Sequence, residues 1–355
     1  MTRKANQPFV RNAWYIGAWA EEIDNGLLAR TIMDEPVVIY RDAKGKVGAL
    51  EDRCCHRGAP LTHGHVIQEG LQCGYHGLTF DTTGNCVMIP GQKNIPAKAR
   101  VKHYPVVERD EILWIWMGEP SLADENLIVQ YPFHNDRKKW PHRKAMFQIK
   151  SNYMLMIDNL MDLTHLGYVH NKTIGGNPNH HVAADMETKQ TENGAYFIRW
   201  MMDHQPPPTY QKGGQFTGKV DRWQEFEYVG PSIVLQWSGA LAVGKGARDN
   251  REQKGFHLRI LHGATPETET TFHYFWSAAN GYRQEDPGAT QEMYDEIYPT
   301  FIEDKVIMEV QQERINLDPQ RDLVEIHADG ALSLARLSLD KIIERDNTAM
   351  SQAAE

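Results

Sequence analysis

The sequence predicts an α+β protein made of two parts, a β-rich N-terminal domain and a C-terminal domain that combines an antiparallel sheet with long helices. Residues 9–118 hold short β-branched and aromatic runs bounded by turn residues, which is typical of strands. After a break at Gly118–Pro120, segments of helical spacing flank a long strand-rich stretch. A chain of 355 residues is long enough for two domains, and we expect them at 8–118 and 119–345.

In the N-terminal part, Val37–Tyr40 and Ile112–Trp116 are the clearest strands because β-branched and aromatic residues fill them. Asp42–Gly45 and Asp81–Gly84 combine an aspartate with a closing glycine, which predicts hairpin turns. This part therefore reads as a series of short strands joined by tight turns.

The C-terminal part begins with Asn152–Val169, where apolar and polar residues alternate roughly at helical spacing. Ala195 to Ala279 again looks like strands, with Trp and Tyr scattered among turns. Gln291–Leu317 is a long amphipathic helix candidate. Strands flanked by a few long helices indicate an α+β domain with an antiparallel sheet.

The bulk composition argues against several classes of protein. A hydrophobic fraction of 41% and a charged fraction of 24% are those of a globular protein. The formal net charge of −9, without a Lys/Arg stripe, argues against nucleic acid as a partner. No run of about 18 apolar residues predicts a membrane span. Met1–Gln7 is polar and basic with no apolar segment behind it, so we expect no signal peptide and a cytoplasmic location.

All four cysteines lie within 33 residues, which in a cytoplasmic chain favours metal binding over disulfides. Cys54 and His56 are followed by sixteen residues and then by Cys73 and His76, in the pattern C-x-H-x16-C-x-x-H. Two thiolates and two imidazoles can hold a [2Fe–2S] cluster, with sulfurs on one iron and nitrogens on the other. A structural zinc site is the alternative. A zinc finger, however, pairs Cys with Cys and His with His, whereas each short pair here is mixed.

A second group of metal-binding residue types lies in Asn159–His170, whose core has the pattern D-x-x-H-x4-H. We expect Asp162 and His165 to be i,i+3 neighbours on a helix, with His170 just beyond, where Gly167 loosens it. Non-haem iron oxygenases use two histidines and one carboxylate on one face, with open positions for O₂. Two histidines five residues apart are weak evidence when taken alone.

The predicted helix Gln291–Leu317 carries a candidate third ligand. Its apolar line runs through Ile297, Phe301 and Met308, and Asp304 lies on the same face. A carboxylate on a buried stripe costs several kcal/mol unless it is paired or bound to a metal. A buried salt bridge is therefore the alternative to a ligand role.

The segments Cys54–Leu61, Cys73–Leu78 and Asn159–His170 together resemble the signatures of Rieske-type ring-hydroxylating and demethylating oxygenases. The resemblance continues to about residue 337 and is closest to the group of vanillate O-demethylase, dicamba monooxygenase and toluenesulfonate methyl-monooxygenase. Cys55 departs from the family, which more often has Pro there. We predict that Cys55 and Cys86 are packing residues rather than ligands.

The resemblance implies a Rieske [2Fe–2S] cluster on the two Cys–His pairs of the N-terminal domain. It implies a C-terminal catalytic domain of the helix-grip type that binds a mononuclear Fe(II). The matching iron ligands are His165, His170 and Asp304, with Glu303 and Glu309 as weaker rivals to Asp304.

Asp162 and Asn159 are the candidate catalytic residues of the second segment. In the family, the matching aspartate hydrogen-bonds to a cluster histidine and to an iron histidine, usually across a subunit boundary. Here that link would join His76 of one chain to His165 of the next. It needs a head-to-tail ring, so a homotrimer is implied. The alternative for Asp162 is a salt bridge in the interior of a helix.

The sequence lacks a G-x-G-x-x-G dinucleotide fingerprint after a strand, so a separate protein must supply electrons. The resembling group uses a flavin reductase that carries a ferredoxin-type cluster and takes electrons from NADH. The implied reaction is O₂-dependent monooxygenation of a small aromatic acid, by O-demethylation or methyl hydroxylation. Ring cis-dihydroxylation is a second possibility, and a Rieske electron carrier with a non-catalytic second domain is a third.

The sequence indicates the substrate-binding residues less clearly than the metal ligands. The resemblance aligns His262 with a position that contacts the aromatic acid in the dicamba-acting member of the group, and Gln236 falls near another such position. Either side chain can hydrogen-bond a carboxylate or a sulfonate. The alternative is that both are ordinary residues of a sheet.

Overall fold

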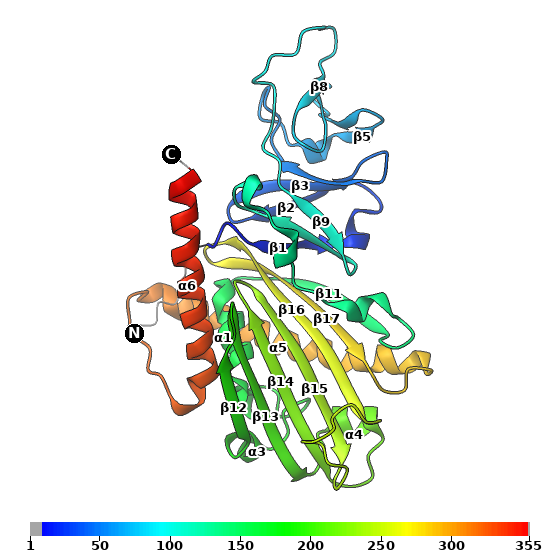
Figure 1. Cartoon of the computed structure of the whole chain (residues 1–355), viewed down its shortest axis with the longest axis vertical. Helices are drawn as coiled ribbons and strands as arrows, with labels where there is room; N and C mark the ends of the chain where they lie inside the picture. Colours follow the sequence, from blue (N-terminus) through cyan, green and yellow to red (C-terminus); the bar gives the residue numbers. More distant parts are fainter. Residues whose placement is uncertain (1–8, 354–355) are drawn as a thin grey trace. The chain divides into compact units, whose positions relative to one another are not determined.

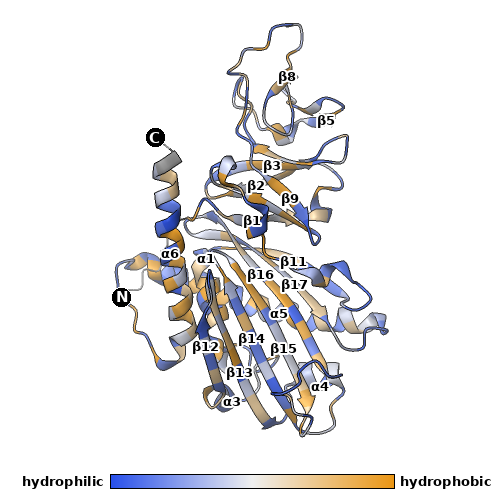
Figure 2. Cartoon of the chain, in the orientation of Figure 1, coloured by the Kyte–Doolittle hydropathy of each residue, from blue (hydrophilic) through white to orange (hydrophobic). Residues whose placement is uncertain are grey.

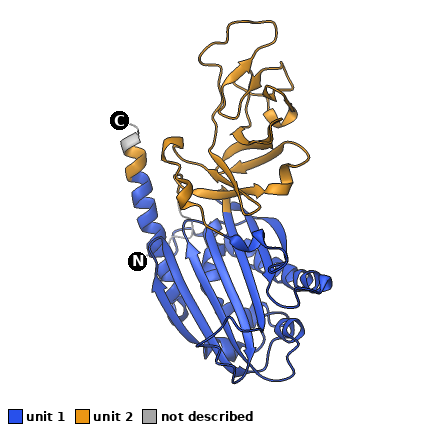
Figure 3. Cartoon of the chain, turned by 45° about the vertical axis from the view of Figure 1, so that its right-hand side comes forward, with its two compact units in different colours: residues 1–8, 131–264, 269–347 blue, residues 9–130, 265–268, 348–355 orange. Residues whose placement is uncertain are grey.

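The computed structural model describes residues 9–353. Met1–Gln7, on which the expectation of no signal peptide rests, lies outside the described residues, as does Pro8 at the start of the first predicted domain. The described chain forms two compact units (Figure 3), one with residues 9–130, 265–268 and 348–353, and the other with residues 131–264 and 269–347.

The N-terminal unit is built from short antiparallel strands, as predicted. Gly45 has φ 84° in the turn between β3 (Glu35–Arg41) and β4 (Val47–Glu51), and Gly84 has φ 80° in the turn between β7 (Thr79–Phe80) and β8 (Cys86–Met88). Both predicted hairpins are confirmed. The run Ile112–Trp116 forms β10, and all five of its residues are buried. The sheets are β1 (Trp14–Trp19), β10 and β9 (Val106–Arg109); β2 (Leu28–Ile32), β3 (Glu35–Arg41) and β4 (Val47–Glu51); and β5 (His65–Ile67), β6 (Gly70–Gln72), β7 (Thr79–Phe80) and β8 (Cys86–Met88).

The other unit contains one antiparallel sheet of seven strands (Figure 1). Polar and apolar residues mix along its strands, and the edge strand β12 is almost wholly hydrophilic and exposed (Figure 2). Hydrophilic side chains on an edge protect it from pairing with other chains. In spatial order the strands are β11 (His142–Ile149), β17 (Thr271–Asn280), β16 (Phe256–Thr268), β15 (Ile233–Ala242), β14 (Val220–Val229), β13 (Gly194–His204) and β12 (Asp185–Gln190).

Both units also contain helices. No helix in residues 9–353 is both long and apolar enough to cross a membrane. The α-helices are α1 (Tyr153–Met161), α2 (Leu166–Val169), α3 (Pro178–Val182), α4 (Pro208–Gly214), α5 (Pro287–Leu317) and α6 (Gly330–Ala353). The 3₁₀ helices of the described chain are η1 (Ala20–Ile23), η2 (Leu61–His63), η3 (Pro120–Leu122), η4 (Glu125–Leu127), η5 (Pro132–Asn135), η6 (Leu163–His165) and η7 (His327–Asp329).

The long helix α5 confirms the predicted amphipathic helix. It begins after Asp286, whose carboxylate accepts the Gly288 amide at 2.9 Å and so caps the helix. Ile297, Phe301 and Asp304 are buried together on one face, as the helical spacing predicted. Helix α5 packs against α1 and against β11 and β17, which places this face at the sheet.

The predicted helix over Asn152–Val169 is interrupted at Asp162, not at Gly167. Asp162 has φ −130° and ψ 103°, which is extended backbone, and it separates α1 from η6. The reason is its side chain, which caps the following turn and so competes with continuation of the helix. His165 and His170 therefore lie at the ends of short helical turns rather than along one helix.

Candidate metal centres

Two loops of the N-terminal unit carry the Cys–His pairs, and both close in the same way. The Gly58 amide donates to the Cys54 carbonyl at 2.9 Å, and the Gly77 amide donates to the Cys73 carbonyl at 3.0 Å. Gly58 and Gly77 have φ values of 70° and 74°, a left-handed conformation that favours glycine. The sequence thus builds two equivalent turns, each with a Cys–His pair.

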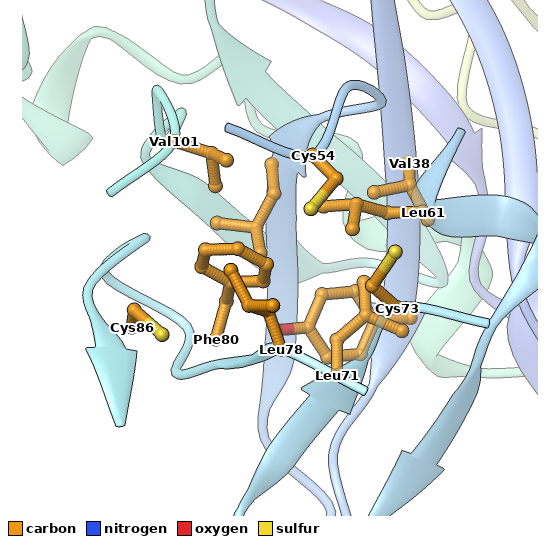
Figure 4. Close-up of a cluster of buried hydrophobic side chains, with 11 residues drawn as sticks. Val38, Cys54, Leu61, Leu71, Cys73, Leu78, Phe80, Cys86 and Val101 are labelled. Carbon is orange, nitrogen blue, oxygen red and sulfur yellow. The ribbon is translucent and has the colours of Figure 1, made fainter. Parts of the chain in front are cut away.

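The two thiols are buried and the two imidazoles are exposed. Cys54 and Cys73 are 3% and 2% exposed within a hydrophobic cluster (Figure 4), and the ring centroids of His56 and His76 lie 4.7 Å apart. Burial raises the pKa of Cys54 to about 11, and the Cys73 thiol adds to the effect. A thiolate there needs a nearby cation, which the irons of a cluster would supply. Two sulfurs and two ring nitrogens are the donor set of a Rieske cluster.

The structure separates the two remaining cysteines. The prediction that Cys55 is a packing thiol is wrong, because Cys54 takes the inward position of the loop and leaves Cys55 exposed to solvent. The same prediction is confirmed for Cys86, which is 8% exposed and belongs to the hydrophobic cluster (Figure 4).

The second candidate centre brings together η6, α2 and α5. His165, His170 and Asp304 each offer one ligand atom, and these atoms lie within 4.8 Å of one another. Asp304 Oδ1 is 3.0 Å from His170 Nε2 and 3.7 Å from His165 Nε2. Asp304 is 134 residues away from His170 in the chain, so tertiary packing alone makes this group.

Hydrogen bonds at Nδ1 orient both imidazoles. His170 Nδ1 lies 2.7 Å from Glu303 Oε2, and His165 Nδ1 lies 2.7 Å from the main-chain carbonyl of Asp162. A carbonyl and an ionised carboxylate only accept, so each Nδ1 carries the proton and each Nε2 faces Asp304. Neutral rings would direct two lone pairs at one carboxylate oxygen. A metal cation among the three groups removes that repulsion.

The two imidazoles differ in their affinity for a proton. Burial lowers the pKa of His165, and the charge of Asp304 offsets only part of that effect. Burial also opposes protonation of His170, but the hydrogen bonds and charges of Asp304 and Glu303 outweigh it and raise the pKa of His170. A metal at this site would therefore compete with a proton mainly at His170.

Asn159 adds a fourth polar group. Its Nδ2 donates to Asp304 Oδ1 at 3.1 Å, while its Oδ1 is buried without a hydrogen-bond partner in the described part of the chain. Buried acceptors are rarely left unpaired. An unpartnered amide oxygen beside two imidazoles and a carboxylate fits a bound cation.

The rival carboxylates of α5 occupy other positions. Glu303 contacts the Nδ1 side of His170, away from Asp304. Glu309 accepts the Lys150 amide at 3.0 Å and pairs with Lys305. Of these three acidic residues, Asp304 is the one that lies with both histidines.

Asp162 lies in a different setting from the one expected. Its Oδ1 accepts the amide of Thr164 at 2.9 Å and the hydroxyl of Thr164 at 2.7 Å, so it caps η6. The salt bridge inside a helix is therefore wrong. The expected bond between its carboxylate and His165 is also wrong, because the main-chain carbonyl makes that contact. The second carboxylate oxygen, Oδ2, makes no hydrogen bond within the described chain.

His262 and Gln236 lie on neighbouring strands and bond to each other. His262 Nε2 is 2.9 Å from Gln236 Oε1, and His262 Nδ1 is 2.7 Å from the Tyr274 hydroxyl. Gln236 Nε2 in turn donates to Ser238 Oγ at 2.7 Å. Burial lowers the pKa of His262 to about 3, so the ring is neutral near pH 7. Tyr274 and Ser238 could not be predicted from the sequence, because only strand register brings them to this chain of hydrogen bonds.

Known protein families match both parts of the chain. Residues 13–105 match the Rieske [2Fe–2S] domain. Residues 149–345 match the vanillate O-demethylase oxygenase C-terminal domain. These two matches correspond to the Cys–His loops and to the sheet-and-helix unit that holds the second site.

Individual relatives extend over nearly the whole chain. The toluene-4-sulfonate monooxygenase system iron-sulfur subunit of Comamonas testosteroni is 38% identical over 96% of this chain and 98% of its own length. The dicamba O-demethylase oxygenase component of Stenotrophomonas maltophilia is 35% identical over 86% and 89%. The crystal structure of dicamba monooxygenase bound to 3,6-dichlorosalicylic acid matches with a TM-score of 0.87 and 31% identity, over 96% of this chain and 99% of that one.

The fold and the two groups of metal-binding residues define the class of protein, a Rieske-type oxygenase component in which a cluster domain and a catalytic domain share one chain. This chain belongs to the vanillate O-demethylase family of such components. It is an oxidoreductase that works within a multicomponent system and carries a Rieske [2Fe–2S] domain. The predicted family and fold class are confirmed.

Proposed function

We propose that this chain is the terminal oxygenase that uses O₂ to hydroxylate or remove a methyl group of an aromatic acid. Its relatives include a toluene-4-sulfonate monooxygenase subunit, a vanillate O-demethylase and a dicamba O-demethylase. The observation that carries the proposal is the convergence of His165, His170 and Asp304 around one point. We assign these three residues as the ligands of a mononuclear iron.

The cluster ligands are assigned to the two Cys–His turns, and the domains to residues 8–118 for the cluster and 119–345 for catalysis. When bound, the cluster supplies electrons and the iron activates O₂ for attack on a C–H bond. Glu303 and the Asp162 carbonyl hold the two imidazoles with Nε2 toward Asp304, so that an iron would be held by these three groups. Asn159 provides a further polar contact beside Asp304.

The substrate's acidic group is assigned to His262 and Gln236. The neutral His262 ring donates from Nε2, and the Gln236 amide donates from its own Nε2. A carboxylate or sulfonate would accept from both after displacing their present partners, Gln236 Oε1 and Ser238 Oγ. Such an exchange replaces two neutral acceptors by a charged one, which makes stronger hydrogen bonds.

The protein partners follow from the reaction. A separate reductase supplies electrons, because this sequence has no dinucleotide fingerprint after a strand. The resemblance to the family implies that this reductase is of the flavin and ferredoxin type. A head-to-tail homotrimer would bring His76 of the partner subunit to Asp162. The carboxylate oxygen Oδ2 of Asp162 is available for that contact.

The test is turnover of methoxylated and methylated aromatic carboxylates and sulfonates by the purified chain with a reductase, scored by product mass. We expect loss of a methyl group or gain of one oxygen atom, and about three irons per chain, two in the cluster and one mononuclear. A cis-diol product would identify a dihydroxylating enzyme instead. About two irons per chain, with no product from any substrate, would identify an electron carrier.

A further inference from the structure

Two arginines are buried on one face of the large sheet. Arg199 on β13 and Arg222 on β14 are 3% and 4% exposed. They share a face because Met201, two residues after Arg199, is the register partner of Arg222. No carboxylate among the described residues comes within 4.0 Å of either guanidinium. Buried cations without a counter-charge are costly, and proteins rarely contain them.

The main chain satisfies these guanidinium groups only in part. Arg222 Nη2 donates to the Ile174 carbonyl over 3.3 Å, and Arg199 Nη2 donates to the His181 carbonyl. Arg222 Nε and Arg199 Nη1 are buried and have no hydrogen-bond partner in residues 9–353. A guanidinium has five N–H donors, and Arg222 Nε and Arg199 Nη1 remain for an acceptor that the described residues do not provide.

Burial and the charge of Arg222 lower the pKa values of nearby histidines. Burial lowers the pKa of His181 to about 4, and the Arg222 charge adds to the effect. Burial lowers the pKa of Arg199 to about 10, against the opposing charge of Asp162. His180 is likewise shifted to lower pKa, by burial and then by the neighbouring His204 and Arg222.

A cavity of about 200 Å³ opens beside Arg222. The ring of Tyr210 lies 4.4 Å from the guanidinium carbon, so it covers one face and leaves the in-plane N–H groups for hydrogen bonds. Stacked rings of His180 and His204, 4.0 Å apart, line another part of the wall. The apolar lining comes from Met201, Val220 and the prolines Pro206–Pro208.

We infer that this cavity binds an organic monoanion, a carboxylate or sulfonate on a single aromatic ring, with its anionic group on Arg222. A guanidinium fork matches a carboxylate in a bidentate manner, which pairs the buried charge and its free donors together. The remaining wall is largely apolar, and a cavity of about 150 Å³ is already large enough for a benzene ring. An inorganic anion would leave that apolar wall unfilled.

The site is separate from the proposed catalytic pocket. None of the proposed iron ligands lines it, and neither do His262 and Gln236. It is nevertheless connected to His170, because the Gly175 amide donates to the His170 carbonyl at 3.0 Å and Gly175 lines the cavity. A bound anion would therefore hold the segment that follows His170. Anion binding in this cavity is independent of the reaction that the enzyme catalyses.

The direct test is a crystal of the holoenzyme soaked with 4-iodobenzoate, whose iodine is located by anomalous scattering. We expect iodine density in the cavity with the carboxylate within hydrogen-bond distance of Arg222. Density at other places only, or none at all, would overturn the inference.

The solution test is calorimetric titration of the holoenzyme with benzoate, with sulfate at equal ionic strength as the inorganic anion. Arg222→Gln and Arg222→Lys should each weaken benzoate binding by about tenfold or more, because a charge-assisted bidentate contact is lost. Arg248→Gln, which removes an exposed arginine paired with Asp185, is the matched control and should leave affinity unchanged. Without ligand, Arg222→Gln should keep or raise the thermal midpoint, since it removes an uncompensated charge.

Other outcomes would count against the site. Benzoate affinity that falls in His262→Asn but not in Arg222→Gln would place the ligand beside His262. A lower thermal midpoint of Arg222→Gln together with unchanged benzoate affinity would show that Arg222 only stabilises the fold, through its hydrogen bond to the Ile174 carbonyl. Sulfate that binds as tightly as benzoate would remove the aromatic ring from the proposal.

Discussion

Changing Asp162 to asparagine and to alanine separates the capping role of this side chain from its proposed role between subunits. The cap consists of two hydrogen bonds from Thr164 to Oδ1, at 2.9 Å and 2.7 Å. Asparagine keeps that oxygen and caps as well as aspartate does, whereas alanine removes it at a cost of about 1 kcal/mol. Asp162→Asn should therefore unfold with the catalytic domain at nearly the wild-type urea midpoint, and Asp162→Ala at a lower one.

The functional effect should follow the charge rather than the cap. His165 is bonded through the main-chain carbonyl of residue 162, which both variants retain. The side-chain contact that both variants weaken or lose is therefore the proposed one to His76 of the partner subunit. A charge-assisted bond of about 1.5–3 kcal/mol corresponds to a factor of about 10 to 100. Single-turnover product formation by the prereduced protein should fall by that factor in both variants, with the cluster spectrum and iron content kept.

Two results would refute this reasoning. A normal single-turnover yield in a folded, fully metallated Asp162→Asn protein would remove the proposed bridge. A loss of stability in Asp162→Asn as large as that in Asp162→Ala would remove the capping argument. Thr164→Val, which loses the hydroxyl bond but keeps the amide bond, should have a small effect on stability and none on turnover.

Three further predictions concern the second site and its surroundings. Glu303→Gln should weaken Co²⁺ or Fe²⁺ binding by about tenfold, because a neutral partner replaces the carboxylate on His170 Nδ1. Dialysis and visible absorption measure the binding. Glu309→Gln is the control and should bind metal normally. Arg336→Ala should lower the free energy of unfolding of its unit by about 3–5 kcal/mol, since it breaks a mostly buried ion pair with Asp158 at 2.6 Å. A change below about 1 kcal/mol in urea unfolding would contradict this prediction. The folded-state pKa of His262 is about 3, below its ordinary value of 6.5, so the unfolded chain takes up a proton first and stability is lost as pH falls below 6.5. The thermal midpoint of His262→Gln should fall less steeply between about pH 6.5 and 5, and an identical slope would contradict the shift.

Local sequence was enough to predict the parts of this protein that short-range physics builds. The hairpins at Asp42–Gly45 and Asp81–Gly84 could be predicted because a closing glycine permits the left-handed conformation that the turn needs. The buried face of α5 could be predicted because helical spacing alone places Asp304 in line with Ile297 and Phe301. In both cases the residues that act together lie within a few turns of one another.

Predictions from local sequence were wrong where a side-chain hydrogen bond or the path of a loop overrides the regular pattern. The pattern around Asp162 is compatible with a continuous helix, yet its carboxylate caps the next turn and breaks the helix there. Cys55 follows a buried cysteine and looked suitable for packing, but the loop turns its side chain to solvent. Each outcome depends on a balance of single hydrogen bonds or on the path of one loop, which composition and periodicity do not record.

The residues suited to hold metals can be identified from the sequence alone, because donor type and spacing are local properties. Only tertiary packing decides that Asp304 meets His170 across 134 residues. It also places Asn159 beside Asp304, with an amide oxygen that has no hydrogen-bond partner in residues 9–353. It also decided that Arg199 and Arg222 are buried with no carboxylate of the described residues within 4.0 Å of either guanidinium. The reason is that these contacts come from the register of the strands and the packing of α1 and α5, which depend on the whole core at once.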